Sequence, residues 1–298
     1  MKYYNSIKLT VELLLIIILS VSCKKTKDIV IPDNTVPYYE AVTILQIQSY
    51  VNKAYIDISG AEPSVADRDF WVNNLKTNGL DSSARVSFIS SLQNGSDYVT
   101  QFNNVYIAPM FDGIYDSLTA VAIVDELNYF RSLAIANGDS AISQYWAYEA
   151  SKMVLVSDAS YDFHRGIITI NEYKKRMANC YAYDQINMGV TNFVISCFEN
   201  YLKRSPTDQE QSNSETMVNG QSARIFMRDG SSRGDFLNIM TSSAGFYEGL
   251  VIDTYLHLLS RRPNSYEMSS LTEALSNGSK SIKDIQRILT ATVEYTGF

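Results

Sequence analysis

One arrangement of residues occurs three times in this chain and constrains its fold more than any other feature. In the last copy, Tyr255 precedes Pro263 by eight residues, Asn264 follows the proline, and Glu267 lies four positions after it. A residue before a proline avoids the α conformation, so a first helix is expected to end at this corner. Asn264 and Glu267 have the spacing of a helix N-cap and its reciprocal partner. The copy therefore predicts a helix, a proline corner and a second helix.

The same offsets recur in two earlier segments. The middle copy contains Phe198, Arg204, Pro206, Thr207 and Glu210, and the first copy contains Tyr55, Pro63, Ser64 and Asp67. Repeats of this kind usually form units that bury their apolar faces against neighbouring units. We therefore expect an all-α fold of helical hairpins or three-helix units, spanning 44–98, 193–247 and 250–298. In the last unit, the third helix is expected to start after Ser281 and to run to Tyr295.

The residues of the last copy also resemble a known pattern. The segment 258–267, LLSRRPNSYE, and the later Val293-Glu294-Tyr295 are similar to L-x-R-x-P-[ST]-x-x-E followed by S-x-E-[FY]. That pattern is typical of small helical domains of unknown function in bacterial secreted and envelope proteins. The resemblance implies a helical unit over about half of the mature chain and carries over no catalytic residue. The first copy departs from it, with Gly60-Ala61 in place of the arginine, and the middle copy has an insertion around Arg228.

The N-terminus has the features of an export signal over residues 1–22: a positively charged start and an apolar stretch too short to span a membrane. Residues 20–23 (SVSC) resemble the lipobox of bacterial lipoproteins, which implies cleavage before Cys23 and acylation of that cysteine. An ordinary signal followed by a chance cysteine is the alternative. Several acyl chains would anchor the protein stably to a membrane. By resemblance to enterobacterial sorting, the absence of Asp after Cys23 favours the outer membrane, with the face left open.

The remaining chain is expected to form a tether and one domain. Residues 23–39 predict an extended tether, and residues 40–298 a single all-α domain. Residues 99–190 do not follow the repeat and predict a helical insertion, because no Pro- or Gly-rich linker separates them. Long helices are expected at 118–136 and 140–156.

Composition limits the function without defining it. Hydrophobic residues make up 46% of the chain, which is enough to bury a core, and the net charge of −7 argues against a nucleic-acid partner. The 21 Tyr and 12 Phe residues fit two interpretations. They pack between helices, or they form a surface that grips a glycan or a partner protein.

Catalytic chemistry has few candidates in this sequence. The only histidines are His164 and His257. The segment 162–165 (DFHR) is expected in a loop and is the one polar cluster with catalytic character, although a structural loop is the favoured interpretation. His257 is expected to be a packing or surface residue. No phosphate-binding, dinucleotide-binding, nucleophile-elbow or zinc-protease motif occurs, so we predict no catalytic residue, metal or cofactor.

Cys180 and Cys197 are the cysteines that remain once Cys23 is acylated. They lie 17 residues apart. On one continuous helix they would be roughly 25 Å apart. We therefore expect free, buried thiols unless the chain turns near Gly189, in which case an oxidising periplasm would allow them to pair.

The segment 224–235 is the most distinctive polar stretch. Its three arginines, Arg224, Arg228 and Arg233, stand among glycines that indicate an exposed excursion from the repeat. Loops that leave a rigid scaffold are frequent binding sites. The arginines are a candidate partner contact, and an inert surface loop is the alternative.

These features favour a non-catalytic, lipid-anchored accessory or scaffold protein of the outer membrane. Its expected partners are the membrane, through Cys23, and an integral protein of a secretion, motility or nutrient-uptake complex. A surface lipoprotein that binds a glycan or polymer is the first alternative, and an enzyme with an unrecognised site is the second.

Overall fold

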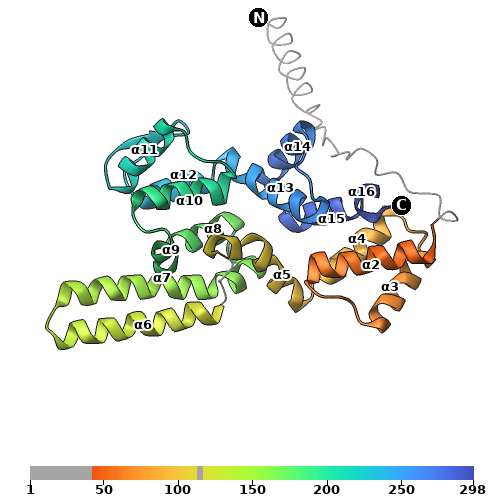
Figure 1. Ribbon diagram of the computed structural model, residues 1–298, viewed down its shortest axis with the longest axis horizontal. Helices are drawn as coiled ribbons and strands as arrows, with labels where there is room; N and C mark the ends of the chain where they lie inside the picture. The colour runs from red at the N-terminus through yellow and green to blue at the C-terminus, as the bar shows by residue number, and fades with distance from the viewer. Residues whose placement is uncertain (1–41, 113–116) are drawn as a thin grey trace, which may run out of the picture. The chain divides into compact units, whose positions relative to one another are not determined.

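Capping side chains divide this chain into many short helices. The computed structural model describes residues 42–112 and 117–298 (Figure 1), so the signal, Cys23 and the tether lie outside the described residues. Ser, Thr, Asp or Asn precedes most helices and accepts a backbone N–H with its side chain, as at Ser64, Thr207 and Asn264. The fold is all-α, as the sequence predicts: the described residues form fifteen α-helices, one 3-10 helix and one small β-hairpin.

The elements follow one another along the chain in this order. They are α2 (Ile44–Ser59), α3 (Val65–Thr77), α4 (Ser82–Gln93), α5 (Ser96–Tyr106), η2 (Ala108–Phe111), α6 (Ser117–Ala136), α7 (Ser140–His164), α8 (Ile170–Ala178), α9 (Tyr181–Ile186), α10 (Val190–Leu202), α11 (Asp208–Val218), β1 (Ala223–Ile225), β2 (Arg228–Gly230), α12 (Arg233–Thr241), α13 (Ala244–Leu259), α14 (Ser265–Ser276), α15 (Ile282–Thr290) and α16 (Val293–Thr296).

Each copy of the repeated arrangement consists of four helices. The first copy is α2 to α5, the middle copy α10 to α13, and the last copy α13 to α16. The fourth helix of each begins two residues before a buried aromatic, which is Tyr98, Phe246 or Tyr295. The helix α13 is therefore both the last helix of the middle copy and the first helix of the last copy.

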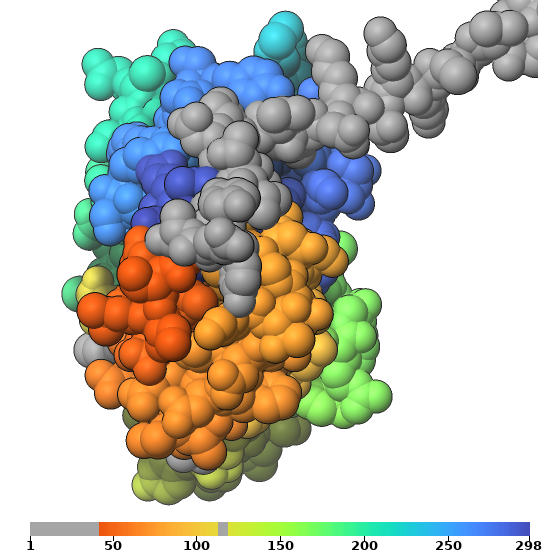
Figure 2. Space-filling view, turned by 90° about the vertical axis from the view of Figure 1, so that its right-hand side faces the viewer, coloured from red at the N-terminus to blue at the C-terminus, as the bar shows by residue number. Residues whose placement is uncertain are grey.

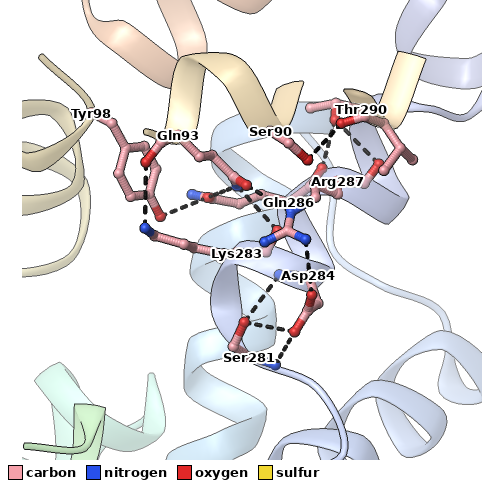
Figure 3. Close-up of polar contacts among 10 residues, drawn as sticks. Ser90, Gln93, Tyr98, Ser281, Lys283, Asp284, Gln286, Arg287 and Thr290 are labelled. Atoms are coloured by element: carbon pink, nitrogen blue, oxygen red, sulfur yellow. Dashed lines mark hydrogen bonds and ion pairs between the residues drawn. The ribbon is translucent and has the colours of Figure 1, made fainter. Parts of the chain in front are cut away.

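The first and last copies pack against each other although they are far apart in the sequence. Helix α4 packs on α15 and α2 on α16, and Figure 2 shows the first copy, in orange, next to the blue helices of the last copy. Figure 3 shows the polar part of this interface, in which the Gln93 side-chain amide donates to Gln286 Oε1 at 2.9 Å and Arg287 Nε donates to Gln93 Oε1 at 2.8 Å. Tyr98 Oη also donates to Gln286 Oε1, at 2.9 Å. These bonds satisfy amide groups that burial would otherwise leave unpaired.

In the middle copy, α10 and α13 cross at close range. A Cβ atom added at Gly249 would come within 2.0 Å of the Tyr201 carbonyl oxygen, so only glycine allows this approach. The insertion predicted around Arg228 is the antiparallel hairpin β1–β2, which pairs Arg224 with Asp229.

Between the first and middle copies, α6 and α7 form a long antiparallel pair (Figure 1). Buried residues at heptad spacing on α6, namely Ala120, Leu127 and Ala134, face α7, where Ala150 and Met153 are buried. Helix α7 also packs on α8, which in turn packs on α12. Among the described residues, none of the helices combines the length and apolar character of a membrane-spanning segment.

Two expected helix boundaries are wrong. Helix α7 continues to His164, so the segment 162–165 is mostly the last helical turn and not a loop. The third helix of the last copy stops at Thr290, because Thr292 accepts the N–H of Tyr295 and caps a separate α16. The turn near Gly189, which the sequence left open, is present: Gly189 adopts a φ of 86° between α9 and α10.

Candidate functional site

The arginine of the corner motif organises the last copy. Arg261 donates from Nη1 and Nη2 to the two carboxylate oxygens of Glu267, each at 2.8 Å. Its other edge, Nε and Nη2, donates to Glu294 at 2.6 and 2.7 Å. The guanidinium also lies over the Tyr255 ring, 5.1 Å from its centroid. The motif's aromatic, arginine and two glutamates are therefore one contact network, and both acids raise the pKa of Arg261.

The middle copy repeats half of this network. Arg204 donates to both carboxylate oxygens of Glu210 at 2.7 Å and lies over Phe198, 5.4 Å from the ring centroid. Hydrogen bonding to Arg204 lowers the pKa of Glu210 to about 2. The position that matches Glu294, two residues after the N-cap of the fourth helix, is Gly245. Within the described residues, no acceptor bonds to Arg204 Nε, so this edge of the guanidinium is open.

The first copy contains no such network. Gly60 and Ala61 replace the arginine, as the sequence indicates, and Tyr55 packs instead against Phe88 with ring centroids 6.1 Å apart. Gly60 has a φ of 77°, and a Cβ atom there would meet Gln101 at 2.8 Å. At this corner, the first copy therefore makes packing contacts and no arginine–glutamate ion pair.

A pocket of about 530 Å³ opens beside Arg204 and Gly245. Its lining combines cations, one acid and apolar side chains: Leu202, Arg204, Phe226, Arg228, Ile239, Ser242, Ser243, Ala244, Gly245 and Glu248. The Glu248 charge contributes to a raised pKa of Arg204, after the larger effect of the hydrogen bond to Glu210. No ion pair joins Glu248 to Arg204 in the described part of the chain. The sequence signal for this pocket is the glycine at the motif's second acidic position, Gly245.

The turn between β1 and β2 borders this pocket and is strained. Phe226 and Met227 both have positive φ, 48° and 61°, the pattern of a two-residue type I′ turn that normally requires Asn and Gly. Phe226 lies in the pocket and contacts Phe198, with ring centroids 5.9 Å apart. Met227 is 93% exposed. The turn therefore presents an apolar side chain to solvent at the edge of the pocket.

The three arginines predicted as one contact occupy three different environments. Arg224 forms a bidentate pair with Asp229 on the exposed face of the hairpin, with distances of 2.7 Å. Arg233 pairs with Asp184 and stacks on Phe193, 3.9 Å from the ring centroid, which fastens α12 to α9 and α10. Only Arg228 lines the pocket, where Nη1 donates to the Ser242 hydroxyl.

The two histidines have structural surroundings. The imidazole of His164 lies edge-on to Tyr98 and Phe102, with centroid distances of 5.8 and 5.2 Å. Neither of its nitrogens has a hydrogen-bond partner among the described residues. Burial, and secondarily the charge of Lys283, lowers its pKa from 6.5 to about 4, so the ring is neutral at pH 7. His257 Nε2 lies 2.8 Å from the Asp57 carbonyl oxygen and joins α13 to α2.

Both described cysteines are free and buried, as expected. Of the two arrangements left open, the structure has the turn at Gly189: Cys180 precedes α9 and Cys197 lies in α10, yet they form no disulfide. Burial raises the pKa of Cys180 to about 11 and of Cys197 to about 12, so both are protonated thiols at neutral pH. Such thiols are unreactive as nucleophiles.

Lys174 is buried in the packing between helices. Its side chain lies in α8, and burial lowers its pKa to about 7, with a further lowering by the charge of Lys203. The opposite charge of Asp253 acts in the other direction but bonds directly to Lys203, at 2.8 Å. Lys174 is not among the residues that line the pocket at Arg204.

The α6–α7 pair carries the largest group of exposed apolar side chains in the described chain. Tyr129 is 60% exposed and Leu133 43%, and they lie one turn apart on the side of α6 that faces away from the buried residues. The other large exposed apolar residues of the pair are Val121, Ile135, Ile142, Tyr145, Tyr148, Val154, Leu155 and Tyr161. Exposed apolar side chains gathered on one pair of helices often mark a binding site.

Neither a protein-family model, nor a curated protein, nor a solved structure shows a match to this chain. The resemblance of the corner motif to small helical domains of envelope proteins therefore stays a prediction. In residues 42–112 and 117–298, no group of three or more His, Cys, Asp or Glu side chains is placed to hold a metal ion.

Proposed function

We propose that this chain is a lipid-anchored, non-catalytic accessory protein of the bacterial outer membrane, whose helical domain binds another envelope protein. The anchor would be Cys23, which lies outside the described residues. The observation that carries the binding role is the exposed apolar side of α6, which contains Tyr129 and Leu133. Large apolar side chains that stay exposed on one side of a helix favour a partner that covers them.

The position of α6 in the fold supports this role. Helix α6 packs along α7 and has no comparably extensive contact with another described element (Figure 1). Its buried residues use one side only, from Ala120 to Ala134, which leaves the opposite side free. A second protein could cover that side without disturbing the repeats.

The charge of the α6–α7 pair favours a polypeptide partner over a direct membrane contact. Residues 117–164 contain six acidic and two basic side chains, a net charge of −4. Anionic headgroups would repel this surface. An apolar surface with basic residues at its rim, on an integral envelope protein, would complement it.

The exposed tyrosines favour a second candidate function, that of a glycan-binding lipoprotein. Tyr129, Tyr145, Tyr148 and Tyr161 are all exposed on this pair of helices. Tyrosine combines an apolar ring with a hydroxyl group, which suits sugars as well as proteins. The two candidates differ in the molecule that contacts these rings.

Site-specific photo-crosslinking in cells tests the protein-binding role. A benzophenone amino acid replaces Tyr129 or Leu133 on α6, and replaces Tyr266 on α14 as the matched exposed control. We expect an adduct with one integral outer-membrane protein from both α6 positions and not from Tyr266. Equal adducts from all three positions, or none from α6, would contradict the proposal. Binding of purified surface polysaccharide that is lost in Tyr129→Ala would support the glycan alternative instead.

The lipid anchor needs a separate test. Cys23→Ser should abolish incorporation of a labelled fatty acid and release the protein from the membrane fraction. Retention of Cys23→Ser in the outer membrane would contradict acyl anchoring while leaving the α6 result unaffected.

A further inference from the structure

Arg204 and Arg261 make the same contacts except for one missing carboxylate. In both, Nη1 donates to the carbonyl oxygen of the next residue at 3.1 Å and the guanidinium binds a glutamate six residues later in bidentate geometry. Arg261 binds a second glutamate, Glu294, through its Nε edge. We propose that the equivalent edge of Arg204 binds the carboxylate of an acidic side chain from a partner polypeptide.

The residues that the structure describes provide no group for this edge. Gly245 stands where the last copy has Glu294, and a Cβ atom there would already touch the Leu202 side chain at 3.1 Å. The pocket of about 530 Å³ occupies the space beside Gly245 and Arg204. A planar guanidinium with one free edge matches a carboxylate through two parallel hydrogen bonds.

The charges in the pocket are compatible with an added acid. Arg228 contributes a second cation, and Glu248 contributes one carboxylate. With Glu210, the pocket region has two cations and two acids before a ligand binds. A ligand carboxylate would give the pocket region a net charge of −1. In the last copy, Arg261 with Glu267 and Glu294 has the same net charge.

The apolar lining indicates a polypeptide ligand. Leu202, Phe226 and Ile239 line the same pocket, and Met227 stands exposed beside it. A glutamate next to an apolar residue would bind Arg204 with its carboxylate and place the apolar neighbour against this lining. In the last copy, Glu294 likewise binds Arg261 while the adjacent Tyr295 is buried. This site is separate from the exposed side of α6, and its carboxylate binding does not depend on the function proposed for that surface.

The chain supplies its own probe for this site. The capped peptide Thr-Val-Glu-Tyr-Thr, copied from residues 292–296, is titrated into the purified protein labelled with ¹⁵N-arginine. The Nε–H resonance of Arg204 is identified by its absence in Arg204→Lys. We expect a saturable shift of this resonance, with a Kd on the order of 1 mM, and an affinity lower by at least about tenfold for the peptide with Gln in place of Glu.

Variants of the protein test the location. Gly245→Glu supplies the missing carboxylate within the chain, and should shift the Arg204 resonance without peptide and weaken peptide binding by at least about tenfold. Arg204→Lys should weaken it similarly, because lysine lacks the bidentate fork; binding by this variant is followed by the Nε–H resonance of Arg228, which lines the same pocket. Arg224→Lys, on the exposed face of the hairpin, is the matched control and should leave binding unchanged. Circular dichroism checks the fold of each variant.

Four results would overturn the proposal. They are no saturable shift with the Glu peptide, equal affinity for the Gln peptide, unchanged binding by Arg204→Lys, and unchanged binding by a folded Gly245→Glu. Binding of galacturonate but not of the peptide would assign the site to an acidic glycan and would overturn the polypeptide assignment. Alanine variants of Tyr129 and Leu133 should bind the peptide normally, so a failure here is distinct from a failure at α6.

Discussion

Arg261 and Glu294, which lie 33 residues apart in the sequence, form a bidentate ion pair that joins the corner of the last copy to α16. Glu267 completes the network from the other side of the guanidinium and also accepts the Asn264 N–H at 2.7 Å. The two acids differ in burial, since the side chain of Glu267 is 4% exposed and that of Glu294 is 42% exposed.

Because of this difference, removing the two charges should lower the free energy of unfolding by different amounts. Glu294→Gln should lower the free energy of unfolding by about 0.5–1 kcal/mol, because solvent screens an exposed pair. Glu267→Gln should lower it by about 2 kcal/mol, because a buried acceptor and a helix cap are weakened together. Urea unfolding of both variants measures the difference. In 1 M NaCl the loss for Glu294→Gln should shrink, and a larger loss for Glu294 than for Glu267 would contradict this account.

The neutral imidazole of His164 predicts a loss of stability in acid. Its pKa is about 4 in the folded protein, below the ordinary 6.5, so the unfolded chain binds more protons between these values. The free energy of unfolding therefore falls as the pH drops from 6.5 to 4. His164→Phe retains an aromatic ring and should remove about 1–2 kcal/mol of this loss at pH 4. Thermal unfolding at pH 7 and pH 4 checks it, and an identical pH dependence in both proteins would refute it.

The buried Lys174 predicts a dependence of stability on pH in the alkaline range. Its pKa of about 7 in the folded protein is below the ordinary 10.5, so the unfolded chain binds more protons from pH 7 to 10.5 and stability rises with pH across this window. Lys174→Met removes the buried charge and should raise the free energy of unfolding by on the order of 2 kcal/mol at pH 7. The gain should diminish by pH 9.5. A variant that is less stable than the parent at pH 7 would mean that the ammonium has a stabilising partner.

The strained turn at Phe226 and Met227 predicts a stabilising substitution. Met227 has a φ of 61° and an exposed side chain, so Met227→Gly removes strain without removing buried contacts. We expect a gain of about 1 kcal/mol in the free energy of unfolding. Met227→Ala keeps a Cβ atom and is the matched control, expected to gain nothing. Equal changes in both variants would show that the backbone conformation at this position is not the cause.

Much of the fold could be predicted because helix ends are decided by nearby residues. Thr207 with Glu210 and Asn264 with Glu267 are capping boxes in the structure, at the spacing that the sequence indicates. The turn at Gly189 was left open, and the restart at Thr292 was missed because apolar periodicity continues through that position. Periodicity describes which side of a helix is buried and does not show where the helix stops.

The contact between the first and last copies could not be predicted in the same way. Gln93 and Gln286 are 193 residues apart, and paired amides leave no hydrophobic pattern in a sequence. Exposure of α6 was missed for a related reason. Apolar residues such as Tyr129 and Leu133 predict burial by their type, and only the fold shows which of them remains uncovered.

The candidate site was predicted only in part. The segment 224–235 was selected for its arginines, but Arg224 and Arg233 find acidic partners within the chain. Arg204 was interpreted only as part of the motif. Its open edge becomes visible when its contacts are compared atom by atom with those of Arg261, which requires coordinates.

The double membership of α13 restricts how this chain can be cut or rearranged. A boundary placed within Ala244–Leu259 would deprive two copies of a packing partner at once. Recombination, grafting and truncation therefore have to treat residues 190–298 as one piece. This half of the protein is a fused pair of units, whereas the first copy ends in a helix of its own.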